Sequence, residues 1–167
     1  MRNNSDNLLS VVNFIARKKN ILFHHIPNAY QYDVVSCIEA AKARKVSITK
    51  EIKHILLRSQ YELIMVHVQA DKLISLRKIK RFLKIKNICQ ADLSRYDQKI
   101  FGRGVICPFI EPFWSMKHLV DVGLFNHDWM TSNDTTKRGY IIFDPKILKC
   151  TKHHYLGDFV KDYDASY

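Results

Sequence analysis

The sequence predicts one mixed α/β (α+β) domain in which a mostly antiparallel β-sheet is flanked by helices. Three observations predict it. The chain has 167 residues, the length of one domain. Hydrophobic residues make up 47% and charged residues 26%, which is typical of a globular protein and not of a disordered one. Apolar segments with helical spacing alternate with short apolar runs typical of strands, several of them close enough to form hairpins.

The N-terminal part contains two predicted helices and one predicted strand. Residues 8–18 carry apolar side chains at helical spacing, and residues 21–25 form a short apolar run that suits a first strand. A second helix is predicted over 33–43. Asp33 would place a negative charge at the positive end of its dipole.

A hairpin and a basic helix are predicted next. The runs 51–59 and 61–69 are strongly apolar and are separated by a polar break, which predicts a hairpin in the middle of the sheet. A helix then begins at Ser75, a suitable N-cap. Its polar side is either a solvated surface or a stripe that contacts phosphates. The basic residues of this side are Arg77, Lys78, Lys80, Arg81, Lys84 and Lys86.

The segment 101–114 is the least regular part of the sequence, and it follows a short predicted helix or turn over 90–100. It holds two glycines, two prolines and four aromatic residues in fourteen positions. Glycine permits close backbone approach, and proline removes a hydrogen-bond donor, so a regular helix or strand is disfavoured. The segment forms either a structural turn with an aromatic cluster or a pocket wall lined by backbone.

The last third is predicted to alternate short strands with polar turns. Its elements are an apolar segment at 118–125, a strand around 128–130, a polar loop at 131–139, a strand at 140–143 and a short helix capped by Asp144. The tail from Lys152 to Tyr167 shows no clear period, and we expect it to pack loosely or to mediate a contact. The core of the domain is therefore expected within about residues 8–150, with one domain over 1–167.

Charge and cysteine usage limit the classes of function. The net charge of +11 and the pI near 9.6 favour a polyanionic partner, although a membrane surface or simple solubility would also fit. No apolar run is long enough to span a membrane, and the first twenty residues do not resemble a signal peptide. The four cysteines contain no Cys-x-x-Cys pair, so we expect reduced thiols in a cytoplasmic protein.

Motifs for metals and nucleotides are missing from the sequence. The pairs His24–His25 and His153–His154 are adjacent, and neighbouring strand positions point to opposite faces, so neither pair chelates readily. There is no phosphate-binding loop and no dinucleotide fingerprint. We therefore predict no metal and no cofactor. Cys107 is either a nucleophile, if a histidine lies close to it, or a small core residue.

Lys53 is unusual because it lies within an apolar strand. Alternation places it on the same face as Ile55 and Leu57, where an ammonium group is partly desolvated unless it opens onto a cleft. It is either a strand lysine that reaches out to water or a binder of an anion or a carbonyl group.

Several segments follow one another in an order known from one family. The helix segment 37–46 is followed by a strand with Lys53, a hairpin partner, an Asp-Lys turn and a helix with spaced leucines. Gly104 to Pro108 then forms a Gly-x-x-x-Pro loop, and HLVDVGL and TSNDTTKRGYIIFDPKIL follow. This succession, over about residues 8–150, resembles the YbaK/ProX family of aminoacyl-tRNA deacylases, the domain also associated with prolyl-tRNA synthetases. Departures are His54 and Ile55 after the lysine, where the family usually has Thr-Leu, and Ile110 in place of a glycine.

The resemblance implies hydrolysis of the ester between an amino acid and the 3′-terminal adenosine of a mischarged tRNA. Lys53 falls at the functional lysine of the family and would bind the terminal adenosine or phosphate and the ester, while the backbone at Gly104 would position the aminoacyl group. Ser132 and Asn133 would line the opposite wall. The further residues expected at the substrate are Cys107, Pro108 and His25, and those expected at the tRNA are Arg77, Lys78, Lys80, Arg81 and Lys84.

The expected cargo is a small amino acid, such as alanine, serine or cysteine, on tRNA-Pro, with prolyl-tRNA synthetase as a further partner. Because an aminoacyl ester is already activated, orientation and backbone donors can suffice, so the absence of a recognisable catalytic triad is expected. The main alternative is a non-catalytic module of the same fold that binds tRNA or a synthetase. A third hypothesis is a hydrolase that depends on Cys107 and is unrelated to tRNA.

Overall fold

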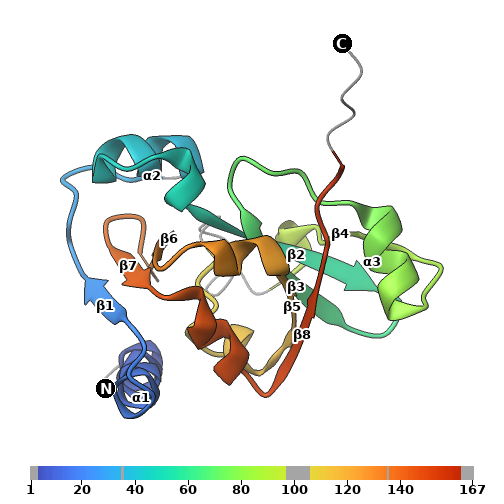
Figure 1. Ribbon diagram of the computed structural model, residues 1–167, viewed down its shortest axis with the longest axis horizontal. Coiled ribbons are helices and arrows are strands. Elements are labelled where there is room, and N and C mark those ends of the chain that lie inside the picture. The colour runs from blue at the N-terminus through green and yellow to red at the C-terminus, as the bar shows by residue number, and fades with distance from the viewer. Residues whose placement is uncertain (1–3, 35, 97–105, 135, 163–167) are drawn as a thin grey trace.

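The strands of the molecule form two sheets, as Figure 1 shows for the computed structural model, which describes residues 4–34, 36–96, 106–134 and 136–162. The three-stranded sheet has the order β1-β7-β6, and the five-stranded sheet has the order β4-β2-β3-β5-β8. The strands are β1 (Phe23–Ile26), β2 (Ile52–Ser59), β3 (Leu63–Gln69), β4 (Ile88–Gln90), β5 (Lys117–Asp121), β6 (Met130–Asn133), β7 (Tyr140–Phe143) and β8 (His153–Gly157).

The fold class predicted from the sequence is confirmed. Of the six strand pairings between the described strands, four are antiparallel, and the two parallel ones join β3 to β5 and β5 to β8. The predicted hairpin is β2-β3, at the centre of the larger sheet, and it pairs His54 with His67. The prediction of a single sheet was wrong. The two sheets meet where β2 begins, through a bridge between Glu51 and Thr131.

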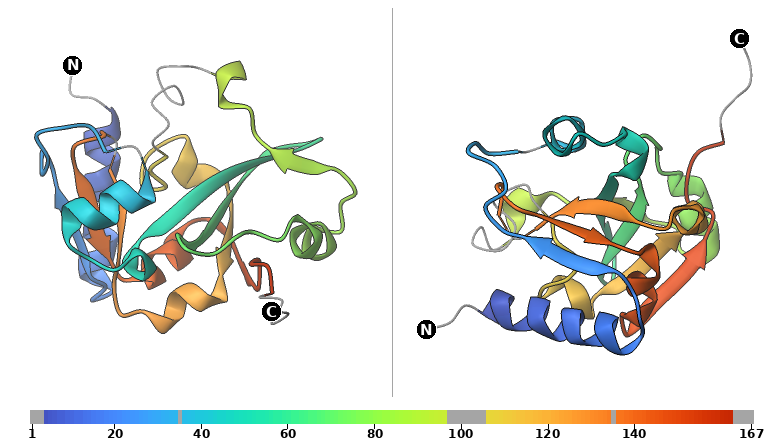
Figure 2. Two further views of the ribbon diagram at one scale, coloured as in Figure 1. Left: turned by 90° about the horizontal axis from the view of Figure 1, so that it is seen from above. Right: turned by 60° about the vertical axis from the view of Figure 1, so that its left-hand side comes forward.

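Within the part of the chain that the structure describes, three α-helices flank the sheets, and they are α1 (Asn4–Lys18), α2 (Cys37–Arg44) and α3 (Leu76–Leu83). The helix α1 runs along one face of the three-stranded sheet (Figure 2) and buries Leu9, Val12 and Ala16 there. The helix α3 covers one face of the five-stranded sheet, where Ile79 packs among the side chains of β2 and β3. Burial of these apolar side chains is the main source of stability for such layers.

The second helix begins later than predicted. Its N-cap is Ser36, which accepts a hydrogen bond from the Glu39 backbone while the Glu39 side chain accepts one from the Ser36 backbone. Asp33 does not act at the helix dipole and instead pairs with Arg138, at 3.0 Å between Oδ1 and Nε. The reciprocal capping box fixed the start of the helix more strongly than the isolated charge that the sequence analysis used.

Two further expectations for the C-terminal third were wrong. Residues 131–133 belong to strand β6 and not to a polar loop, because their polar side chains have buried hydrogen-bond partners. The expected loose tail contains β8, which pairs in parallel with β5. It also contains Phe159, which is fully buried and whose backbone N–H donates to Asp121. The domain core therefore extends beyond residue 150.

Two further predicted elements agree with the structure, whereas the predictions for 90–100 and 101–114 lie partly outside the described residues, at 97–105. Residues 118–125 divide into β5 and a 3₁₀ helix over Val122–Asn126, and Asp144 caps a 3₁₀ helix over Pro145–Cys150. All four cysteines are free thiols. None of the helices within the described residues is long and apolar enough to cross a membrane.

Candidate functional site

Lys53 lies half-buried at a pocket between α2 and the start of β2. Its ammonium group donates to the carbonyl of Ala70 at 3.1 Å, and burial lowers the pKa of the lysine. The pocket has a volume of about 740 Å³. Its walls are mainly apolar, with two further lysines. The lining residues are Ser36, Cys37, Ile38, Ala41, Lys42, Lys45, Val46, Ile48, Lys53, Ala70 and Asp71.

A buried ion pair closes the other side of α2. Arg44 Nη1 lies 2.5 Å from Glu51 Oε2, and both side chains are almost fully buried. Burial raises the pKa of Glu51, and the nearby guanidinium opposes that shift. Thr131 donates to the second carboxylate oxygen at 2.6 Å, and Arg44 also donates to the side chain of Asn133. This cluster joins α2, β2 and β6. Within it, the side-chain oxygen of Asn133 already accepts a hydrogen bond from Arg44.

A row of three histidines crosses the other face of the five-stranded sheet. His54 on β2 and His67 on β3 lie 2.7 Å apart between their Nδ1 atoms. His67 Nε2 lies 2.8 Å from Nδ1 of His118 on β5. At the two ends of the row, His54 Nε2 lies 2.8 Å from the hydroxyl of Ser132, and His118 Nε2 lies 3.0 Å from the carbonyl of Phe113.

Burial keeps this row neutral. Desolvation lowers the pKa of His54 to about 3 and that of His118 to about 4, and it lowers the pKa of His67 well below its ordinary value. Repulsion from neighbouring rings also disfavours protonation: His118 acts on His54, His54 and His118 act on His67, and His154 and His153 act on His118. At neutral pH each ring therefore has one donor nitrogen and one acceptor nitrogen.

Lys53 and Ser132 do not share one pocket. Lys53 and His54 are neighbours in β2, so their side chains leave opposite faces of the strand, and Ser132 contacts His54. Neither Ser132 nor Asn133 lines the pocket at Lys53. The structure thus separates residues that the sequence analysis assigned to opposite walls of one site.

The remaining predicted substrate residues are held in structural contacts. His25 Nε2 lies 2.9 Å from Oδ2 of the buried Asp134. Cys107 is buried, which raises the pKa of its thiol to about 12, so it stays protonated and is a poor nucleophile. Pro108 is buried beside it. Gly104 lies outside the described residues.

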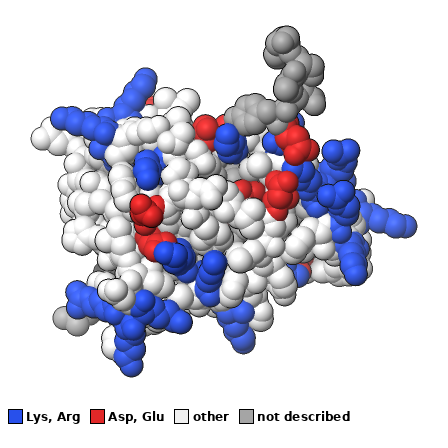
Figure 3. Space-filling view, viewed as in Figure 1, with Lys and Arg blue, Asp and Glu red and all other residues white. Residues whose placement is uncertain are grey.

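Four of the predicted tRNA-binding residues lie on α3, and the fifth, Lys84, is the C-cap of this helix. Figure 3 shows a group of basic side chains at the end of the molecule where Figure 1 places this helix, with acidic side chains beside it. Lys78 differs from its neighbours because its ammonium lies 2.6 Å from both Asp158 and Asp162. Its charge is therefore compensated within the protein, which leaves Arg77, Lys80, Arg81 and Lys84 as the stronger candidates for phosphate contacts.

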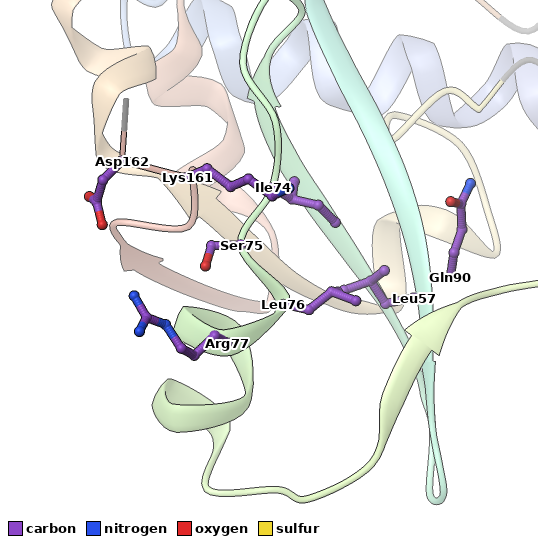
Figure 4. Close-up of a pocket in the computed structure, with 8 residues that line it drawn as sticks. All are labelled: Leu57, Ile74, Ser75, Leu76, Arg77, Gln90, Lys161 and Asp162. Carbon is purple, nitrogen blue, oxygen red and sulfur yellow. The ribbon is translucent and has the colours of Figure 1, made fainter. Parts of the chain in front are cut away.

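A second pocket, of about 610 Å³, lies at the start of α3 (Figure 4). Leu57 and Leu76 face one another at its apolar part, and Arg77 and Asp162 lie at its polar side. Arg77 borders this pocket and is also one of the basic side chains of α3. The pocket therefore adjoins the basic face of that helix.

Sequence reasoning missed the most connected polar residues. Arg44 and Glu51 were not singled out, and His67 and His118 lay within segments that were interpreted by their apolar pattern. A signal was present in the strands, because His54 and His67 lie at positions of β2 and β3 that a hairpin places opposite one another. Their contact with His118 depends on the parallel β3–β5 pairing, which nothing local in the sequence specified.

Among the comparisons with known proteins, only the one with solved structures finds a match, and it establishes the fold. No protein-family model matches the sequence, and no curated protein matches it. Solved structures do share its mixed α/β architecture. One is the crystal structure of a hypothetical protein, with a TM-score of 0.73 and 17% identity, which covers 90% of this chain and 99% of that one.

A second similar structure is described as a candidate trans-editing enzyme for prolyl-tRNA synthetase. Its TM-score is 0.71 at 15% identity, and the match covers 97% of this chain and 100% of that chain. A third, a candidate signal transduction protein from Marinobacter aquaeolei VT8, has a TM-score of 0.59 at 13% identity. That match covers 91% of this chain but 31% of the other, so the same fold also occurs as part of a longer protein. At these identities, the likeness establishes the fold.

Proposed function

We propose that this protein is a trans-editing aminoacyl-tRNA deacylase that hydrolyses the ester of a mischarged tRNA. The observation that carries the proposal is the half-buried Lys53 at the mouth of a pocket, on a fold shared over nearly its full length with a candidate trans-editing enzyme. The proposed cargo is a small amino acid, such as alanine, serine or cysteine, on tRNA-Pro. Prolyl-tRNA synthetase is the proposed further partner.

The chemistry of the Lys53 pocket suits the 3′ end of an aminoacyl-tRNA. The ammonium group of Lys53 donates one hydrogen bond to the carbonyl of Ala70. Its other N–H groups remain as donors for a phosphate or an ester oxygen. Lys42 and Lys45 supply further positive charge at the pocket, and its apolar wall suits a base or a small side chain. Partial desolvation strengthens each of these electrostatic contacts.

The basic helix is placed to bind the rest of the same tRNA. Lys53, Ile55 and Leu57 share one face of β2, and α3 packs against that face. The pocket and the basic side chains of α3 therefore lie on the same side of the five-stranded sheet. The acceptor stem is proposed to run along α3 while its end enters the pocket.

Salt dependence tests this orientation. Replacing Arg81 with alanine should remove about one phosphate contact and reduce the slope of log K against log salt by about 1. Lys78→Ala is the matched control on the same helix, and it should change the slope less because Asp158 and Asp162 already neutralise Lys78. Equal effects of the two variants would contradict the proposed path of the tRNA.

A second candidate function is a non-catalytic module that binds tRNA or a synthetase. The observation that favours it is the separation of Lys53 from Ser132 and Asn133, with Asn133 already bound to Arg44. This module would bind tRNA with the same salt dependence and would release no amino acid. A deacylation time course therefore separates the two functions.

A further inference from the structure

We propose that the pocket at the start of α3 is a nucleotide subsite, which holds one unpaired base of the tRNA 3′ end. This pocket, of about 610 Å³, shares no lining residue with the pocket at Lys53, so the two are separate sites. The subsite rests on the proposed function and deepens it, because it gives the same tRNA a second point of contact. It assigns a role to Gln90 and Lys161, which the path of the acceptor stem leaves unused.

The walls of this pocket suit the flat face of a nucleobase. Ile74 and Leu76 converge on it in Figure 4, with Leu57 behind them. A ligand can reach Leu76, which is 36% exposed, and the partly exposed Ile74, whereas Leu57 is fully buried and closes the apolar wall. Gln90, an exposed residue of β4, also borders the pocket, and its amide offers a donor and an acceptor to the edge of a base. Apolar walls with a few polar groups are typical of ligand sites.

The charge at the pocket favours an anion. No salt bridge joins Arg77 or Lys161, which both line it, to another of the described residues. Asp162 also borders the pocket and attracts Arg77 at longer range, but its carboxylate lies 2.6 Å from Lys78, so its charge is already paired. The two cations are therefore available to a phosphate group, and a ribonucleotide combines a phosphate with a flat base.

One segment of the chain, between β3 and α3, connects the two pockets. Residues 70–71 line the pocket at Lys53, and residues 74–77 line the second pocket. Lys53 and Leu57 are four residues apart on the same face of β2, which corresponds to about 13 Å between their Cα atoms. An RNA strand whose last nucleoside lies at Lys53 and whose stem follows α3 therefore passes the second pocket on its way.

The path of the tRNA supplies the kind of base that this pocket can hold. In an RNA helix the bases are paired and stacked, whereas an unpaired nucleotide exposes both the face and the edge of its base to a protein. The 3′ end of a tRNA is unpaired between the acceptor stem and the terminal adenosine. With the terminal adenosine at Lys53 and the stem along α3, these unpaired nucleotides pass the pocket at the start of the helix.

The affinity of the full chain for two uncharged tRNAs tests the subsite. One is intact tRNA-Pro, and the other lacks its unpaired 3′ nucleotides. Leu76→Ala removes an apolar wall and should weaken binding of the intact tRNA about fivefold, the lower end of the effect of losing one base contact. Leu73→Ala is the matched control, because Leu73 is 63% exposed and does not line the pocket, and it should keep the wild-type affinity.

The truncated tRNA separates a lost base contact from a damaged fold. It should bind to wild type, Leu76→Ala and Leu73→Ala equally, because it lacks the base that the pocket holds. Lys161→Gln should lower the slope of log K against log salt by about 0.7 with the intact tRNA, the value for one phosphate of a single strand, and should leave the slope unchanged with the truncated one. Equal affinity of wild type and Leu76→Ala for the intact tRNA would overturn the proposal.

A further measurement uses the unaltered protein and therefore does not depend on how a variant folds. In uncharged tRNA, 4-thiouridine replaces each of the unpaired 3′ nucleotides in turn, and near-ultraviolet light cross-links it to the residues that it contacts. We expect one of these positions to label residues 74–77 or Gln90. If no position labelled any of these residues, the base would lie elsewhere and the subsite would be refuted.

The subsite and the deacylase function fail separately, because uncharged tRNA contains no ester to hydrolyse. An affinity that depends on Leu76, without release of an amino acid from any charged tRNA, would support the subsite and refute the deacylase. Deacylation that requires Lys53, with equal affinity of wild type and Leu76→Ala for intact tRNA, would support the deacylase and refute the subsite.

Discussion

Lowering the pH from 6 to 4.5 should destabilise this fold steeply, because three histidines are held in their neutral form. His54, His67 and His118 all have pKa values lowered by burial, to about 3 for His54 and about 4 for His118. In the unfolded chain each is protonated below about pH 6.5. The unfolded state therefore binds more protons in this window, and the free energy of unfolding falls as the pH falls.

The magnitude follows from the number of groups. A histidine that is protonated only when unfolded contributes a slope of about 1.4 kcal/mol per pH unit. The row of three therefore contributes up to about 4 kcal/mol per pH unit, a large share of the roughly 5–15 kcal/mol that stabilise a typical domain. Glu51 acts in the opposite direction, because its raised pKa favours proton uptake in the folded state.

Urea unfolding at a series of pH values between 4.5 and 7 measures this slope. The exposed residues Asp92 and Asp162 have lowered pKa values and titrate below the window, so they do not mask the histidines. A His67→Gln variant should lose about a third of the slope. A free energy of unfolding that stays level between pH 4.5 and 6 would refute a buried neutral row.

Three further predictions concern the core and the thiols. Arg44→Met should cost about 3–5 kcal/mol in urea unfolding because it leaves Glu51 buried without its partner, and Arg44→Met with Glu51→Leu should recover much of that loss. Gly139→Ala should destabilise by about 1–3 kcal/mol in the same assay, because its Cβ would overlap the carboxylate of Asp134. In thiol titration of the native protein, Cys107 should stay unreactive until the chain unfolds, and early labelling there would contradict its burial.

Local patterns in the sequence were sufficient to predict the central hairpin and the helices around it. The runs 51–59 and 61–69 became β2 and β3, and Ser75 caps α3 as predicted. These elements are specified by apolar periodicity and capping, which act between residues close in the chain. The strand β8 was missed because its stability comes from parallel pairing with β5, a long-range contact.

The residues of the candidate sites also divide into those that a local sequence pattern predicts and those that depend on long-range contacts. Lys53 was recognisable because a charge within an apolar strand is unusual whatever surrounds it. The contact between Ser132 and His54 joins residues 78 positions apart, and the ion pair between Arg44 and Glu51 depends on how α2 packs beside β6. Such contacts are set by the arrangement of two sheets, which periodicity does not encode.

The central claim is that the protein hydrolyses mischarged tRNA at Lys53. The most direct test is a deacylation time course on tRNAs that carry alanine, serine, cysteine or proline, with cognate and non-cognate acceptors. Wild type, Lys53→Ala and the control Lys78→Ala are compared. We predict release of a small amino acid by the wild type and by Lys78→Ala, with loss in the Lys53 variant. No release from any tRNA, with tRNA binding retained, would contradict the claim and favour the binding module.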